Sequence, residues 1–292
     1  MKNYLIFDIG GTFVKWAITN ENYEIVEQSK WPFKGKEEGK IVLIQKIKDK
    51  YHEIKSNYKI EAIGISTAGI VDPNSCQING IAHNIKDWGG TNIKKELADL
   101  NVKNIFLEND ANAATIGEST VKNLQNHKNV LMITLGTDIG GGILIDRKIY
   151  RGSNGLAGEV GFQFISNEEV RWGELCSSIG LINLVKEKTK KELTTYDILE
   201  SNDQEIKSVL NHWYKMIGNG LANLLVVMNF DAIIIGGGIS ESNLFDINLI
   251  KENISMFLAK QPVFNETYQL YKASLGNKAA IIGMTKIINE NI

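Results

Sequence analysis

Two stretches of the chain share one pattern of residues, and together they limit the folds that the chain can adopt. The first runs from 4 to 19 and the second from 130 to 145. Each has an apolar segment, a turn rich in Gly, Thr and Asp, and a second apolar segment. β-Branched and aromatic residues follow each turn, which favours a strand there, whereas a dinucleotide-binding or Walker loop leads into a helix. Each stretch therefore predicts a β-hairpin with a tight turn.

The two turns have residues suited to binding phosphate. Their glycines allow backbone N–H groups to approach phosphate oxygens, and their threonine hydroxyls add further donors. The turn residues concerned are Asp8, Gly10, Gly11 and Thr12 in the first hairpin and Gly136, Thr137 and Asp138 in the second. Asp8 could hold Mg²⁺ through water. Either hairpin alone could be an ordinary tight turn, but the pair indicates a nucleotide triphosphate site between two domains, and hence phosphoryl transfer.

Residue periodicity predicts α/β units in both halves of the chain. We expect the hairpin at 130–150, a loop-rich segment at 151–175, and strands at 4–9, 13–19, 23–31, 60–66, 104–107 and 230–238. Helices are expected at 37–58, 92–100, 110–124, 178–190, 194–200, 203–229, 244–260 and 276–290. Residues 1–115, joined by a C-terminal helix at 277–292, are expected to form an N-terminal α/β domain, and residues 116–276 a C-terminal one.

Composition narrows the function classes. A net charge of −2 gives no sign of nucleic-acid binding, and no apolar run reaches the 18 residues of a transmembrane helix. A strand already begins by Tyr4, so we expect no signal peptide. The only cysteines are Cys76 and Cys176, which fits a reduced compartment and not a cysteine-rich zinc site. We therefore expect a cytoplasmic protein with neither nucleic-acid nor membrane partners.

The sharpest local pattern is Glu-Asn-Asp-Ala-Asn-Ala-Ala at 108–114. A strand is expected to end at Leu107 and a helix to begin near Ala111, so Asp110 lies at a strand-to-helix corner, where ligand-binding clefts often open. A carboxylate there could accept the proton of a substrate hydroxyl that attacks a γ-phosphate. The alternative that Asp110 only caps the helix remains open.

Two further glycine clusters suggest ligand contact. Residues 152–161 contain four glycines around Glu159, a carboxylate that could accept two sugar hydroxyls, although a mobile surface loop would have the same composition. Gly236, Gly237 and Gly238 end an apolar strand. A turn of this kind lets the backbone pass against a flat ring such as adenine.

Taken in order, these segments resemble the ROK family of bacterial sugar kinases, within the actin-like, hexokinase-like ATPase superfamily. The matching segments are 8–12, 108–114, 135–142, 155–161 and 235–239. The resemblance implies an α/β, two-domain actin-like (ribonuclease H-like) ATPase fold. It also implies a cleft between the domains and a hinge that closes over the substrate and excludes water.

The resemblance also implies residue roles. It makes Asp110 the general base and ATP and Mg²⁺ the cofactors, with Asp8 reaching the metal through water and Lys15 supplying a phosphate-binding charge. The substrate-binding residues it implies are Gly69, Asn84, Asn109, Asp110, Glu159 and Glu174. The cofactor-binding residues it implies are Asp8, Gly10, Gly11, Thr12, Lys15, Gly136, Thr137, Asp138, Gly236, Gly237 and Gly238. A sugar substrate and a homodimer are the expected partners.

The chain departs from the family pattern where many members bind zinc. Phe162 replaces a histidine, and the following segment has the single Cys176, whereas tetrahedral zinc needs about four N or S ligands. The resemblance thus implies a zinc-free branch, with Phe162, Phe164 and Trp172 packing in place of the metal. Glu174 keeps the spacing of a glutamate beyond the zinc cysteines and is expected to bind sugar, with a surface role as the alternative.

Asp138 is a second departure, because the family usually has glycine there. Its charge could repel ATP, hold a metal or face solvent.

The expected activity is ATP-dependent phosphorylation of the 6-hydroxyl of a hexose or N-acetylhexosamine. We favour an N-acetylmannosamine kinase of sialic acid catabolism, and β-glucoside kinase or glucokinase are the alternatives. Sugar-responsive transcriptional repressors belong to the same family, but they carry a helix-turn-helix domain ahead of the first hairpin, and no basic recognition helix precedes Tyr4 here. A non-catalytic sugar sensor is a further alternative, against which Asp110 argues.

Overall fold

The computed structural model describes residues 2–80, 84–165, 169–259 and 268–292. The chain divides into two compact units, the first formed by Met1–Thr120, Gly152–Leu156 and Asn277–Ile292, and the second by Val121–Arg151 and Ala157–Gly276. The sequence-based boundary lay at 115/116 and assigned 152–156 to the C-terminal domain. Each unit is described separately below.

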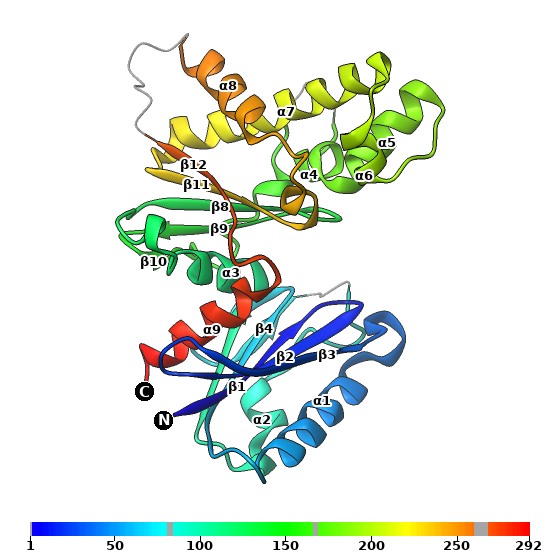
Figure 1. Ribbon diagram of the computed structural model, residues 1–292. Helices are drawn as coiled ribbons and strands as arrows, with labels where there is room; N and C mark the ends of the chain where they lie inside the picture. Colours follow the sequence, from blue (N-terminus) through cyan, green and yellow to red (C-terminus); the bar gives the residue numbers. More distant parts are fainter. Residues whose placement is uncertain (1, 81–83, 166–168, 260–267) are drawn as a thin grey trace. The chain divides into compact units, whose positions relative to one another are not determined.

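The first unit is built on a five-stranded sheet with the order β3-β2-β1-β4-β7. Its strands are β1 (Asn3–Ile9), β2 (Phe13–Asn20), β3 (Ile25–Pro32), β4 (Ile60–Thr67) and β7 (Asn104–Asn109). The first three pair antiparallel, whereas β4 and β7 run parallel to β1. Its main helices are α1 (Gly35–Ile54), α3 (Asp110–Glu118) and α9 (Ala279–Asn289), and a small hairpin of β5 (Ile70–Asp72) and β6 (Gln77–Asn79) and the short α2 (Ile93–Glu96) complete it (Figure 1).

Both faces of the sheet are covered at its centre, which explains why β1 and β4 are largely apolar and buried, whereas β3 at the edge is polar and mostly exposed. Side chains alternate along β1, so that Leu5 and Phe7 pack with α1 while Tyr4 and Ile6 pack with α9. The sheet therefore lies between two apolar layers, and the polar ends of its strands are left to form the candidate site.

Helices α3 and α9 cross with their backbones in contact. A methyl group added to Gly117 of α3 would overlap the carbonyl oxygen of Ala279, and one added to Gly283 of α9 would overlap that of Ala113. Only glycine fits at these two positions. The crossing holds α3, and with it the corner at Asp110, against the C-terminal helix.

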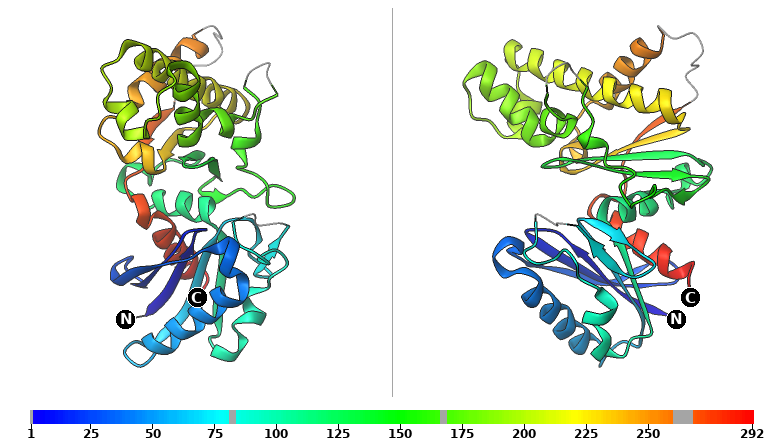
Figure 2. Two further views of the ribbon diagram at one scale, coloured as in Figure 1. Left: turned by 90° about the vertical axis from the view of Figure 1, so that its right-hand side faces the viewer. Right: turned by 180° about the vertical axis from the view of Figure 1, so that it is seen from behind.

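The second unit repeats the strand arrangement of the first. Its sheet has the order β10-β9-β8-β11-β12, and in both units the first strand lies between the second and the fourth. The strands are β8 (Val130–Leu135), β9 (Ile139–Ile145), β10 (Lys148–Ile149), β11 (Ala232–Gly236) and β12 (Gln269–Lys272). The helices are α4 (Trp172–Cys176), α5 (Ser178–Thr189), α6 (Thr195–Glu200), α7 (Gln204–Met228) and α8 (Ile247–Leu258), shown from two further sides in Figure 2. The two hairpins predicted from the sequence thus open two α/β units of one topology.

Several predicted elements have different bounds. The strand expected from 23 begins at Ile25, because Tyr23 has a φ of 65° and belongs to a turn. The helix expected at 37–58 begins at Gly35, is kinked at Gly39 and ends at Ile54. The helix expected at 110–124 ends at Glu118.

Several short elements have no counterpart in the prediction. Helix α4 begins within the segment 151–175, which was expected to be rich in loops, and β5, β6 and β12 were not predicted at all. Each is completed by residues outside itself: Glu174 of α4 accepts the N–H of Arg171, β5 pairs with β6, and β12 pairs along β11. Sequence periodicity over such short segments carries little information.

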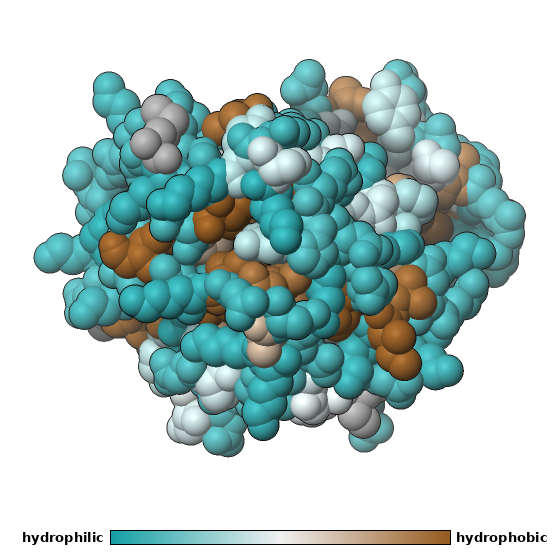
Figure 3. Space-filling view, turned by 90° about the horizontal axis from the view of Figure 1, so that it is seen from below, coloured by the Kyte–Doolittle hydropathy of each residue, from teal (hydrophilic) through white to brown (hydrophobic). Residues whose placement is uncertain are grey.

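Hydrophobic residues appear in separate patches between hydrophilic ones on the face that Figure 3 displays. Among the described residues, we find no helix that combines the length and the apolar character needed to cross a membrane.

Candidate active site

Asp8, near the end of β1, is held by two neighbouring strands of the first unit. Ser66 of β4, its parallel register partner, donates its hydroxyl to Asp8 Oδ1 at 2.7 Å. Lys15 of β2, its antiparallel partner, lies with its Nζ 3.2 Å from Asp8 Oδ2. The carboxylate is thereby fixed in orientation at the start of the glycine turn. A carboxylate held in this orientation is suited to binding Mg²⁺ through a water molecule.

The turn after β1 is closed by its own backbone and by a neighbouring loop. The N–H of Gly10 donates to the carbonyl of Phe13 at 3.0 Å, and the carbonyl of Gly11 accepts from the N–H of Gly35 at 3.0 Å. A methyl group at Gly11 would come within 3.2 Å of Asn84 Cβ. The structure therefore brings Gly11 and Asn84, which were predicted separately as phosphate and sugar contacts, into one place, and the Thr12 side chain is exposed beside them.

Asp110 is the first residue of α3 and directly follows β7. Its Oδ1 accepts the N–H of Ala111 at 2.9 Å, while Asn109 is the N-cap, and its Oδ1 accepts the N–H of Asn112 at 3.0 Å. The capping role thus belongs to Asn109. Asp110 is only partly buried at the strand-to-helix corner where the sequence placed it.

Two more hydrogen bonds hold the loop that faces this corner. Asn109 Nδ2 donates to the carbonyl of Gly69 at 3.1 Å, and Gly69 has a φ of 110°, which glycine adopts without strain. The buried Trp88 donates its Nε1–H to Thr67 Oγ1 at 2.9 Å. Asn109 and Gly69 are therefore neighbours, and Trp88 supports their loop from the core.

In the second unit, the glycine turns after β8 and β11 lie together. The N–H of Gly136 donates to the carbonyl of Asp138 at 3.0 Å, which closes the turn between β8 and β9. Gly237 has a φ of 93°, and a side chain there would overlap the backbone of Leu135, immediately before that turn. Because β8 and β11 are parallel neighbours, their carboxyl ends bring Gly136, Thr137 and the cluster Gly236, Gly237 and Gly238 to one edge of the sheet.

Asp138 faces the start of α4. Its Oδ1 accepts the N–H of Ile139 at 2.8 Å, and a methyl group on Gly173 would overlap this oxygen. Arg171 Nη1 lies 3.9 Å from Asp138 Oδ2. The structure thus adds a fourth role to the three considered for Asp138. Its carboxylate lies beside Arg171, with which it can form an ion pair.

Glu174 is engaged by the same arginine. Its Oε2 accepts the backbone N–H of Arg171, the N-cap residue of α4, at 3.0 Å, and its Oε1 accepts Arg171 Nη2 at 3.1 Å. The backbone and then the guanidinium of Arg171 lower the pKa of Glu174. A structural role therefore accounts for the position of Glu174, and its contact with sugar stays a prediction.

The aromatic packing expected in place of zinc is only partly present. Trp172 is fully buried, whereas Phe162 is 58% exposed and Phe164 is 61% exposed, so the expectation that all three form a supporting core is wrong. Arg171 stacks on the Phe162 ring, with its guanidinium carbon 4.8 Å from the centroid. Within 2–80, 84–165, 169–259 and 268–292, no group of three or more His, Cys, Asp or Glu residues could hold a metal ion.

Glu159 has a raised pKa. The residue is exposed as a whole, but the protein around its carboxyl removes part of the solvation, and this desolvation raises the pKa, with a smaller contribution from the charge of Asp138. The folded state therefore keeps this proton to higher pH than the unfolded chain. The contribution of Glu159 to stability is present below its unfolded pKa and declines as pH rises through its folded value.

We predict that Asp138→Asn lowers the titration midpoint of Glu159, because it removes the nearby negative charge. The midpoint should remain above its ordinary value, since desolvation is the larger cause. Carboxyl chemical shifts of ¹³C-labelled glutamate, with Glu159→Gln for assignment, measure this. Asp146→Asn serves as the control for removing one charge from this unit, and equal midpoints in both variants would contradict the coupling.

Three residues that contact the predicted site residues were not predicted from the sequence. Ser66 holds Asp8, Arg171 faces Asp138 and Glu174, and Asn277 Oδ1 accepts Lys15 Nζ at 3.0 Å. Ser66 could have been found from strand pairing, since parallel β1 and β4 place it opposite Asp8. Arg171 lies far along the chain from Asp138, and Asn277 far from Lys15, and neither residue belongs to a motif.

Comparison with known proteins gives consistent matches. The ROK family model matches residues 4–291. Relatives include a glucokinase of Halalkalibacterium halodurans, 27% identical over 96% of this chain and 93% of its own length, and a beta-glucoside kinase of Listeria monocytogenes, 27% identical over 95% and 94%. A xylose repressor of Bacillus subtilis is 28% identical over 81% of this chain and 63% of the repressor.

Solved structures match over nearly the full length. A ROK family glucokinase from Streptomyces griseus, in complex with glucose and AMPPNP, is 25% identical with a TM-score of 0.76 and covers 98% of both chains. A proposed N-acetylmannosamine kinase from Listeria monocytogenes is 24% identical with a TM-score of 0.84 and covers 99% of this chain and 100% of its own. The predicted α/β, actin-like ATPase fold is confirmed, and the chain belongs to the ROK family.

Proposed function

We propose that the protein is an ATP-dependent sugar kinase that phosphorylates the 6-hydroxyl of a hexose or N-acetylhexosamine. The observation that carries this proposal is the partly buried Asp110 at the end of β7, in a chain that matches the ROK family from 4 to 291. The kinase relatives and the glucokinase structure with glucose and AMPPNP support it.

In the proposed mechanism, Asp110 accepts the proton of the sugar hydroxyl as that oxygen attacks the γ-phosphate. Asn109, tied to Gly69 and capping α3, holds the carboxylate corner rigid and presents its amide to the sugar. Asn84, which lies beside Gly11, is a further proposed sugar contact. In the second unit Glu159, and in our proposal Glu174, accept sugar hydroxyls.

The proposed donor-binding residues are those of the glycine turns. Backbone N–H groups at Gly11, Thr12 and Thr137 would contact the phosphates of ATP. Gly10 and Gly136 would let the phosphates approach closely, while their own N–H groups close the two turns. The cluster Gly236, Gly237 and Gly238 would contact the adenosine. Bound Mg²⁺ would neutralise phosphate charge, and Asp8 is the residue placed to orient its water ligands.

We propose N-acetylmannosamine as the substrate, and a β-glucoside or glucose as the alternatives. The proposed N-acetylmannosamine kinase fits the whole chain in structure, whereas the glucokinase and beta-glucoside kinase relatives favour glucose or a β-glucoside. Sugar epimers differ in one hydroxyl, whose hydrogen bonds decide the preference. The proposal also includes a homodimer in the cytoplasm and a site without zinc.

A coupled assay of ADP release tests the activity. The sugars are N-acetylmannosamine, glucose, mannose, N-acetylglucosamine and cellobiose, and N-acetylmannosamine is expected to give the highest kcat/KM. A higher value for glucose or cellobiose would replace the substrate but keep the kinase. If no sugar produced ADP, the kinase proposal would fail.

The xylose repressor relative gives a reason to weigh a regulatory function. Two results would favour it: sugar binding without ADP release, which is the property of a sensor, and sequence-specific DNA binding that sugar relieves. A net charge of −2 argues against the second of these.

A further inference from the structure

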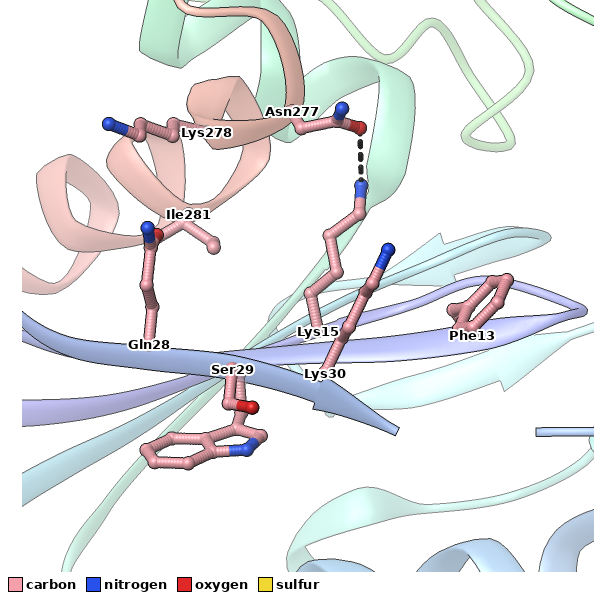
Figure 4. Close-up of a pocket in the computed structure, with 9 residues that line it drawn as sticks. Phe13, Lys15, Gln28, Ser29, Lys30, Asn277, Lys278 and Ile281 are labelled. Atoms are coloured by element: carbon pink, nitrogen blue, oxygen red, sulfur yellow. Dashed lines mark hydrogen bonds between the residues drawn. The ribbon is translucent and has the colours of Figure 1, made fainter. Parts of the chain in front are cut away.

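A pocket of the first unit carries an excess of positive charge. It has a volume of about 480 Å³ and lies over β2 and β3 beside the start of α9 (Figure 4). The described residues that line it include Lys15, Lys30 and Lys278, and none of them is a carboxylate. The chain as a whole is slightly acidic, so a cluster of this kind is a local property of the pocket.

The three lysines differ in their ionic partners. Lys15 pairs with Asp8, but no carboxylate in the described parts of the chain lies within 4.0 Å of Lys30 or Lys278. Lys30 is the direct cross-strand partner of Lys15, and like charges in that position repel. Its Nζ lies 4.9 Å from the centroid of the Phe13 ring. An anion in the pocket would relieve this repulsion.

The start of α9 adds to the positive potential in the pocket. Lys278 is its N-cap and makes no side-chain capping hydrogen bond, and Ile281 in its first turn lines the pocket. The first N–H groups of a helix point out of its end and carry partial positive charge. Figure 4 shows Lys15 reaching from the sheet to Asn277 just ahead of this helix. Lysine ammonium groups and helix N–H groups together are the donor set that phosphate oxygens accept.

We propose that this pocket binds a phosphate-bearing anion, with Lys30 and Lys278 as its charged contacts. Lys15 connects the pocket to Asp8, because its Nζ contacts both Asp8 and Asn277. The phosphate could belong to the nucleotide donor or to a separate phosphorylated metabolite. The first source rests on the proposed kinase function, while binding of phosphate itself does not.

The double variant Lys30→Gln/Lys278→Gln tests the proposal, and Lys36→Gln/Lys103→Gln is the matched control. The control removes the same charge from exposed lysines of the first unit that do not line the pocket. Calorimetric titration without sugar would use inorganic phosphate, pyrophosphate, ATP and a hexose 6-phosphate as probes. Circular dichroism would establish that both variants are folded.

We expect the pocket variant to bind pyrophosphate at least about tenfold more weakly than the wild type and the control, with the difference shrinking as salt rises. If ATP binding weakens in parallel, the ligand is the donor. If ATP binding is unchanged and hexose phosphate or phosphate binding is lost, the ligand is a separate metabolite. Equal binding by the pocket variant and the control, or no binding of any probe to the wild type, would overturn the proposal. Because binding is measured without turnover, an inactive enzyme would not affect this result.

Discussion

Asp110→Asn is expected to lower kcat by about 10²–10⁴-fold, the range that a positioned general base contributes. Sugar affinity should change little, because asparagine keeps an oxygen that can accept the N–H of Ala111, as Asp110 Oδ1 does. The start of α3 should also persist, since Asn109 and not Asp110 is its N-cap. The loss is therefore expected in turnover and not in folding.

The measurement is a steady-state assay with the preferred sugar, combined with titration of that sugar and a thermal melt. Asp49→Asn, at an exposed residue of α1, is the control for replacing a carboxylate by an amide in the same unit. If Asp110→Asn kept a near-normal kcat, the general-base role would be wrong. If the variant lost sugar binding and also melted at a lower temperature, Asp110 would instead have a structural role.

Gly283→Ala is expected to destabilise the first unit by about 3 kcal/mol, which corresponds to a fall in its melting midpoint of roughly 5–10 °C. The added methyl group would overlap the carbonyl oxygen of Ala113, so α9 and α3 would have to separate along their crossing. Gly117→Ala should act in the same way against Ala279. Because α3 begins at Asp110, the same displacement should also reduce activity.

The expected loss of stability is opposite in sign to the usual effect of a Gly→Ala substitution in a helix. In a helix without such a contact, Gly→Ala stabilises by about 0.5–1 kcal/mol, because alanine loses less conformational freedom on folding. Gly238→Ala is the control for stability, since a side chain there would meet nothing within 4 Å. Urea unfolding followed by circular dichroism gives the comparison. A gain in stability for Gly283→Ala would contradict the close crossing.

Much of the fold was predictable because its signals are local. The apolar runs on either side of the turns at 8–12 and 136–142 specify hairpins, and the long amphipathic helix α7 shows a clear helical period. The resemblance carried by the segments around Asp8, Asp110, Glu159 and 235–239 then identified the family, which the match over 4–291 confirmed.

Some side-chain environments could not be predicted from the residue pattern. Phe162 and Phe164 are as apolar as core residues but are exposed, because burial depends on what packs against a side chain from elsewhere in the chain. Glu174 has the spacing of a ligand, but it accepts hydrogen bonds from Arg171, three residues earlier. That pairing is local, and no motif marks it.

The sequence by itself determined the order of the strands and helices, the two glycine hairpins and the corner that holds Asp110, since these follow from steric and hydrophobic preferences within a few residues. Only the tertiary structure decided which side chains meet. Ser66 and Lys15 reach Asp8 through strand register, Arg171 reaches Asp138 through the placement of α4, and Lys278 reaches the pocket beside Lys30 because the last helix packs on the first sheet. Such contacts join residues that are distant in the chain, and their energies arise only when the chain has folded.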